Sequence, residues 1–149
     1  WFLLLSAALS LAGCAQKPLK EGTLADIYGD LQALNVLPPM ITVDADTAYD
    51  FYGIAPEDYD EAAMYIAEDS LRADEVLLFR CADDAAAARV AGLLDKRMTQ
   101  KGNEAKDYSP EQYAIIQRGK ILKNGRSLAL IVSPDIDKLT EVYGRYAVR

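Results

Sequence analysis

The composition of this chain argues against several classes of protein. Its 149 residues carry 23 acidic and 16 basic side chains, for a net charge of −7, and they include no histidine. An acidic chain lacks the basic surface that nucleic-acid binding needs, and without imidazole this chain cannot use Ser-His-Asp or Cys-His catalysis or histidine metal ligands.

The first feature of the chain is an apolar run that stops at a cysteine. Residues 1–13, WFLLLSAALSLAG, contain no charge and are shorter than the roughly 20 residues that span a bilayer, but they match the core of a signal peptide. Leu11, Ala12, Gly13 and Cys14 fit the lipobox that lipoprotein signal peptidase recognises. We therefore predict a signal peptide over 1–13 and a lipid on Cys14. The alternative is a buried N-terminal helix with an ordinary cysteine, but no amphipathic period supports it.

The remainder of the chain has the length of one domain. Residues 14–22 are predicted to be the lipidated cysteine and a polar tether, and residues 23–149 a single domain of ordinary size. If Cys14 is acylated, Cys81 has no cysteine partner, so we expect the domain to be stabilised by its apolar core and not by a disulfide.

Two helices are predicted at the start of the domain. Thr23 and Asp26 form a capping-box pattern, and apolar residues follow at helical spacing. Two prolines at 38–39 end this helix and predict an extended connector. Residues 44–53 predict a second helix that stops at its final glycine.

A strand pair and a long helix are predicted in the middle of the chain. Residues 62–69 and 74–81 read as two strands of an antiparallel hairpin. The second strand is apolar on both faces, so we expect cover on both faces of the sheet. An acidic cap at Asp83 or Asp84 then opens a helix over 85–102, and a short helix is expected over 113–117.

The final predicted elements are a hairpin and a helix. Asn124-Gly125 lies between two strand-like runs, the signature of a type I′ hairpin, and the last helix opens after Ser133. The main elements thus follow the order ααββαββα, which predicts an α+β domain with a four-stranded, mainly antiparallel sheet. We expect the two later helices on one face and the N-terminal helices on part of the other.

Acidic residues raise two functional hypotheses that the spacing does not favour. Asp44 and Asp46 begin like a calcium loop, but the ligand pattern then fails, so we expect no metal and no cofactor. An acidic cluster could supply the paired carboxylates of a glycoside hydrolase, although charge at a helix start explains part of it. This cluster comprises Glu57, Asp58, Asp60 and Glu61.

Tyrosine is the most abundant aromatic residue, with nine copies against three of phenylalanine. Four of them fall in one short segment, and a tyrosine ring with its hydroxyl suits contacts with a partner or a sugar. These four form the candidate binding surface: Tyr49, Tyr52, Tyr59 and Tyr65. Ordinary half-buried positions at sheet edges and helix ends are the alternative interpretation.

The segment from Tyr52 onward resembles an uncharacterised family of small lipoproteins of Gram-positive anaerobes, catalogued as a domain of unknown function. The resemblance is carried by the run YGIAPED at 52–58, by ADEV at 73–76 and by YSPE at 108–111, and it extends over 24–146. It implies a single small extracytoplasmic domain. The family has no assigned activity, so the resemblance implies no catalytic residue.

These observations predict a membrane-anchored lipoprotein on the outer face of the bacterial cytoplasmic membrane. We expect a non-enzymatic binding or accessory module, held to the membrane by the lipid on Cys14, with an envelope protein or a wall component as partner and no nucleic acid. An envelope hydrolase using carboxylates and a small solute-binding lipoprotein are the alternatives.

Overall fold

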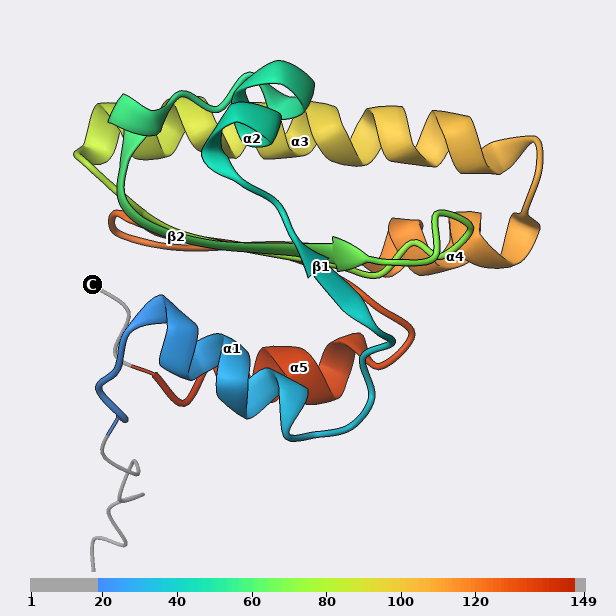
Figure 1. Cartoon of the computed structure of the whole chain (residues 1–149), viewed down its shortest axis with the longest axis horizontal. Helices are drawn as coiled ribbons and strands as arrows, with labels where there is room; N and C mark the ends of the chain where they lie inside the picture. The colour runs from blue at the N-terminus through green and yellow to red at the C-terminus, as the bar shows by residue number, and fades with distance from the viewer. Residues whose placement is uncertain (1–18, 147–149) are drawn as a thin grey trace, which may run out of the picture.

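A five-stranded antiparallel sheet lies between two layers of helices in the computed structural model, which describes residues 19–146 (Figure 1). The strand order is β1-β2-β3-β5-β4, so β1 and β4 form the two edges. The strands are β1 (Met40–Thr42), β2 (Tyr59–Ala67), β3 (Glu75–Cys81), β4 (Lys120–Asn124) and β5 (Ser127–Val132).

The helices divide between the two faces of the sheet (Figure 1). One face packs against α2 (Ala45–Tyr52), α3 (Asp84–Lys106) and α4 (Pro110–Arg118). The other packs against α1 (Leu24–Gln32) and α5 (Ile136–Tyr143). A 3-10 turn, η1 (Pro56–Asp58), precedes β2.

The α+β class with an antiparallel sheet is confirmed, but the predicted strand number and element order are wrong. The fifth strand, β1, is the segment after Pro38-Pro39 that was expected to be a connector. It has only three residues, too few to show an alternating pattern, and it exists because it pairs with β2 at Met40–Ala67 and Thr42–Tyr65. The order is further changed by α4, which was predicted only as a short helix.

The two later helices also lie on opposite faces of the sheet, not on the same face as expected. Both faces of β3 are buried, and each face is covered by a different one of these helices. Leu77 and Phe79 pack in the cluster that contains Leu94 of α3, whereas Leu78 packs in the cluster that contains Leu139 of α5. Each helix therefore covers a different set of β3 side chains.

Local sequence signals for helix and turn ends are largely confirmed. Thr23 and Asp26 form the capping box of α1, and Gly53 ends α2 in the left-handed conformation at φ 72°. The second hairpin closes where predicted, but Asn124 pairs with Ser127, so the turn residues are Gly125 and Arg126. Gly125 has φ 59°, and among the described residues Asn35 is the one residue other than glycine that has positive φ. Arg126 therefore does not have positive φ. A type I′ turn needs positive φ at both central residues, so this turn is of another type.

The two ends of the described chain meet beside α1 and α5. Lys20, in the predicted tether, forms a parallel bridge with Tyr146, and its ammonium contacts Asp30. Within residues 19–146 no helix is both long and apolar enough to cross a bilayer. The predicted signal peptide and Cys14 lie outside the described residues.

Candidate functional site

A fully buried carboxylate, Glu75, begins β3 on the α3 side of the sheet. Its Oε1 accepts a hydrogen bond from Arg97 Nε at 3.2 Å, and its Oε2 accepts one from Lys101 Nζ at 2.5 Å. Arg97 and Lys101 side chains are 21% and 12% exposed, so all three charges lie largely away from water. Two cations therefore share the one carboxylate of Glu75.

The fold explains how residues far apart in the sequence meet here. Arg97 and Lys101 are four residues apart on α3 and so lie on the same helix face. That face crosses the sheet above the start of β3, where Glu75 points toward it. The ring of Tyr52, at the end of α2, lies 5.0 Å from the Arg97 guanidinium. Burial, and then the charge of Glu75, raise the pKa of Tyr52 to about 12.

Two cavities flank Arg97, which lines both of them. The first cavity, of about 210 Å³, lies between the β2–β3 turn, the second half of α3 and α4. The second cavity, of about 250 Å³, lies between α2 and α3. It is bordered by two strongly exposed aromatic residues, Tyr49 (58%) and Phe51 (74%).

The turn that borders the first cavity carries a second buried acid. Asp74 is 1% exposed, and its Oδ2 accepts from Arg72 Nε at 3.1 Å. Its Oδ1 has no hydrogen-bond partner among the described residues. The turn is fixed from α4, because Gln112 Oε1 accepts from the Ala73 backbone N at 2.8 Å. Gln112 thus holds the cavity wall in place.

The four tyrosines proposed from the sequence do not share one surface. Tyr49 and Tyr52 border the second cavity. Tyr59 packs against Phe79, with ring centroids 5.7 Å apart. Tyr65 lies on the opposite face of the sheet, where it stacks on Tyr28 at a centroid distance of 3.5 Å. Only the first two belong to the candidate site.

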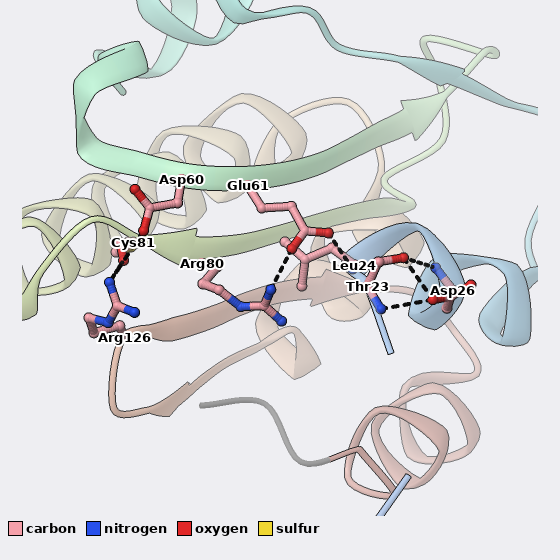
Figure 2. Close-up of polar contacts among 8 residues, drawn as sticks. All are labelled: Thr23, Leu24, Asp26, Asp60, Glu61, Arg80, Cys81 and Arg126. Carbon is pink, nitrogen blue, oxygen red and sulfur yellow. Dashed lines mark hydrogen bonds and ion pairs between the residues drawn. The ribbon is translucent and has the colours of Figure 1, made fainter. Parts of the chain in front are cut away.

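The acidic cluster proposed for a hydrolase is also divided between elements. Asp58 is buried and accepts from Arg89 on α3 at 2.6 Å. Glu61 accepts from Arg80 and from the Leu24 backbone N, both at 2.7 Å, which fastens the start of α1 to the sheet (Figure 2).

A third member of the cluster, Asp60, pairs at 3.3 Å with Arg126, which also donates to the Cys81 carbonyl oxygen (Figure 2). Neither these three carboxylates nor Glu57 lines either cavity. The contacts of Asp58, Asp60 and Glu61 explain them as structural ion pairs.

The remaining sequence candidates have structural roles where the chain is described. Asp44 caps α2 by accepting from the Thr47 backbone N. Cys81 is fully buried, and burial raises the pKa of its thiol, which disfavours the nucleophilic thiolate. Among residues 19–146 no group of three or more acidic or cysteine side chains is placed to hold a metal ion.

The Glu75 network was not identified from the sequence, although it left a signal. A glutamate directly before the apolar run VLLF is unusual for a strand covered on both faces, and a cation pair four residues apart occurs on the following helix. Chemically, the site offers fixed cations beside the first cavity, a buried carboxylate oxygen free to accept, and aromatic rings at the second cavity. These groups suit the binding of a small ligand that carries polar or charged groups.

Comparison with known proteins adds a family and no activity. No curated protein and no solved structure shows significant similarity to the chain. A family model described as "Domain of unknown function (DUF4358)" matches residues 32–133, which include β3 and α3, the strand and the helix that build the Glu75 network. The chain therefore belongs to the DUF4358 family.

Proposed function

We propose that this protein is a lipid-anchored extracytoplasmic lipoprotein whose domain is a non-enzymatic binding module of the bacterial envelope. One observation of the structure supports binding most directly: the buried Glu75–Arg97–Lys101 network lies between two cavities. The lipobox at residues 11–14 supports the anchor and the location.

The arrangement of the layers suits presentation of this site away from a membrane. The described chain starts on the α1 and α5 side of the sheet, whereas α2 and α3 lie on the other side (Figure 1). Only five positions separate Cys14 from Leu19, a reach of at most about 18 Å for an extended chain. A lipid on Cys14 would thus hold the α1–α5 side toward the bilayer and leave the two cavities facing outward.

The contacts of the acidic cluster of residues 57–61 favour binding over hydrolysis by these carboxylates. A hydrolase needs two carboxyl groups converging on a bond in one cleft. Asp58 and Glu61, which are more buried than Asp60, instead pair with Arg89 and Arg80 on separate elements. Their charges are already compensated, so they are poorly suited to act on a substrate.

Metabolic labelling with an alkyne fatty acid tests the anchor. The wild-type protein should carry the label and fractionate with membranes, and Cys14→Ser should lose both properties. Cys81→Ala is the matched control, because this buried thiol lies in the core, and it should keep the label. Unlabelled wild-type protein recovered from the cytosol would refute the proposed location.

Photocrosslinking in intact cells tests whether the side of the domain that carries the two cavities binds a partner. A photoreactive amino acid in place of Phe51, which is exposed beside the second cavity, should give adducts with an envelope component. The control position is Glu141, exposed on α5 in the opposite layer. Equal adducts from both positions, or none from position 51, would contradict a binding role for this side.

A further inference from the structure

We propose that the first cavity binds the α-ammonium carboxylate group of an amino acid. This inference rests on the proposed binding function and names the class of ligand. It is carried by the size of the cavity, the charges around it and one buried oxygen atom.

The charges around the first cavity are balanced, so a ligand with a net charge would upset them. Three cations and three carboxylates line the cavity or contact its lining: Arg72, Arg97, Lys101, Asp74, Glu75 and Glu104. Leaving a charge buried without a partner is costly. A zwitterion adds one charge of each sign and preserves the balance.

Residues that line the first cavity offer a partner for each end of such a zwitterion. Asp74 lines the cavity, and its buried Oδ1 lacks a donor among the described residues, so it can accept from an ammonium group. Arg97 and Lys101 share the single carboxylate of Glu75, so they can donate to a second carboxylate. Charge-assisted hydrogen bonds of this kind are the strong ones.

The size and the apolar lining of the cavity limit the rest of the ligand. Its volume of about 210 Å³ lies below the roughly 300–1,000 Å³ of sites for drug-sized molecules. Ile66, Ala67 and Ile116 supply the apolar part of the lining. We therefore expect a small amino acid, or the end of a larger molecule with the same group.

Titration calorimetry on the full chain in mild detergent tests the ligand class. L- and D-alanine should bind. N-acetylalanine lacks the ammonium and alaninamide lacks the carboxylate, so each should bind about 10- to 100-fold more weakly. Two results would overturn the inference. One is that neither alanine nor a stem peptide with the same group binds, and the other is that the blocked analogues bind as well as alanine.

A second arm of the calorimetry distinguishes two sources of the ligand. The probe is a soluble stem peptide of the cell wall. It ends in a diamino acid that keeps one free ammonium group and one free carboxylate on the same carbon atom. Tighter binding of this peptide than of alanine would point to a wall component, and the reverse order would point to a free amino acid. Both results support the recognition of this group, and neither depends on lipidation, so the proposed anchor is tested separately.

Variants link the binding to the cavity. Asp74→Asn removes the negative acceptor and should weaken alanine binding about 10-fold or more. Asp137→Asn should leave it unchanged, because this side chain is exposed on α5, on the other side of the sheet. Because Asp74 is buried, its variant could fail to fold. Ser70→Trp is the second variant, since this exposed residue lies at the cavity rim and a large ring there should obstruct entry. Undiminished alanine binding by a folded Ser70→Trp protein would refute the assignment.

Discussion

Removing the charge of Glu75 should destabilise the protein far more than removing a surface charge. Breaking a buried ion pair by deleting one partner costs about 3–5 kcal/mol, because the other charge is left uncompensated. Arg97 and Lys101 keep 21% and 12% exposure, so water can solvate them in part. We therefore expect Glu75→Gln to cost about 3 kcal/mol, the low end of that range.

Urea unfolding followed by circular dichroism measures this cost. With a urea dependence of about 2 kcal/mol/M, typical of a small domain, the midpoint should fall by about 1.5 M. Glu141→Gln is the matched control, because Glu141 pairs with Arg145 at the surface with 70% and 62% exposure. Its cost should stay below about 0.5 kcal/mol.

A combined apolar variant separates stability from function at the same site. Replacing the network by Glu75→Leu, Arg97→Met and Lys101→Met removes all three charges together. Such replacements are often neutral or stabilising when the volume is kept, so this variant should recover most of the stability that Glu75→Gln loses. A Glu75→Gln protein as stable as the surface control would refute the view that this network is a tightly coupled buried unit.

Three further predictions concern the core, a turn and alkaline pH. Phe79→Ala removes a fully buried ring and should cost about 3–5 kcal/mol in urea unfolding, whereas a cost below 1 kcal/mol would contradict its place in the core. Gly125 has φ 59°, so Gly125→Ala should destabilise the protein by about 1 kcal/mol, and an unchanged midpoint would refute the left-handed turn. Burial is the first cause that raises the pKa of Tyr28, Tyr52 and Tyr143 to about 12. Unfolded tyrosine ionises near pH 10, so the stability from these three residues is present below about pH 10 and is lost as the pH rises toward 12. Ultraviolet titration should show their late ionisation, and simultaneous ionisation of all tyrosines near pH 10 in folded protein would contradict it.

Signals that act over a few residues were predictable from the sequence. The capping box at Thr23, the helix stop at Gly53 and the hairpin near Gly125 each depend on backbone groups within one turn. β1 was not predictable in this way, because three residues become a strand only through their partner β2. The same limit explains the wrong layering, since both faces of β3 are apolar and the pattern does not say which helix covers which face.

The candidate site was missed for a related reason. The helix predicted over 85–102 ends close to Arg97 and Lys101, but α3 continues to Lys106, so both residues lie inside the helix and over the sheet. Glu75 is 22 and 26 residues from them in the chain. Only the fold of the β3–α3 unit brings the three together, and a pattern of a few residues carries no information about that distance.

The energetic cost of the Glu75 network is itself an argument for a functional role. An apolar residue at position 75 would suit a strand whose following residues on the same face are Leu77, Phe79 and Cys81, all fully buried. Buried ion pairs rarely stabilise a fold more than apolar residues of similar size, so stability alone does not account for the charges. Their place beside two cavities agrees with the proposed binding role, because charges that are already desolvated and held in position by the protein need no further ordering when they bind the charged groups of a ligand. A charge-free variant that folds well but no longer binds alanine would confirm this division between scaffold and site.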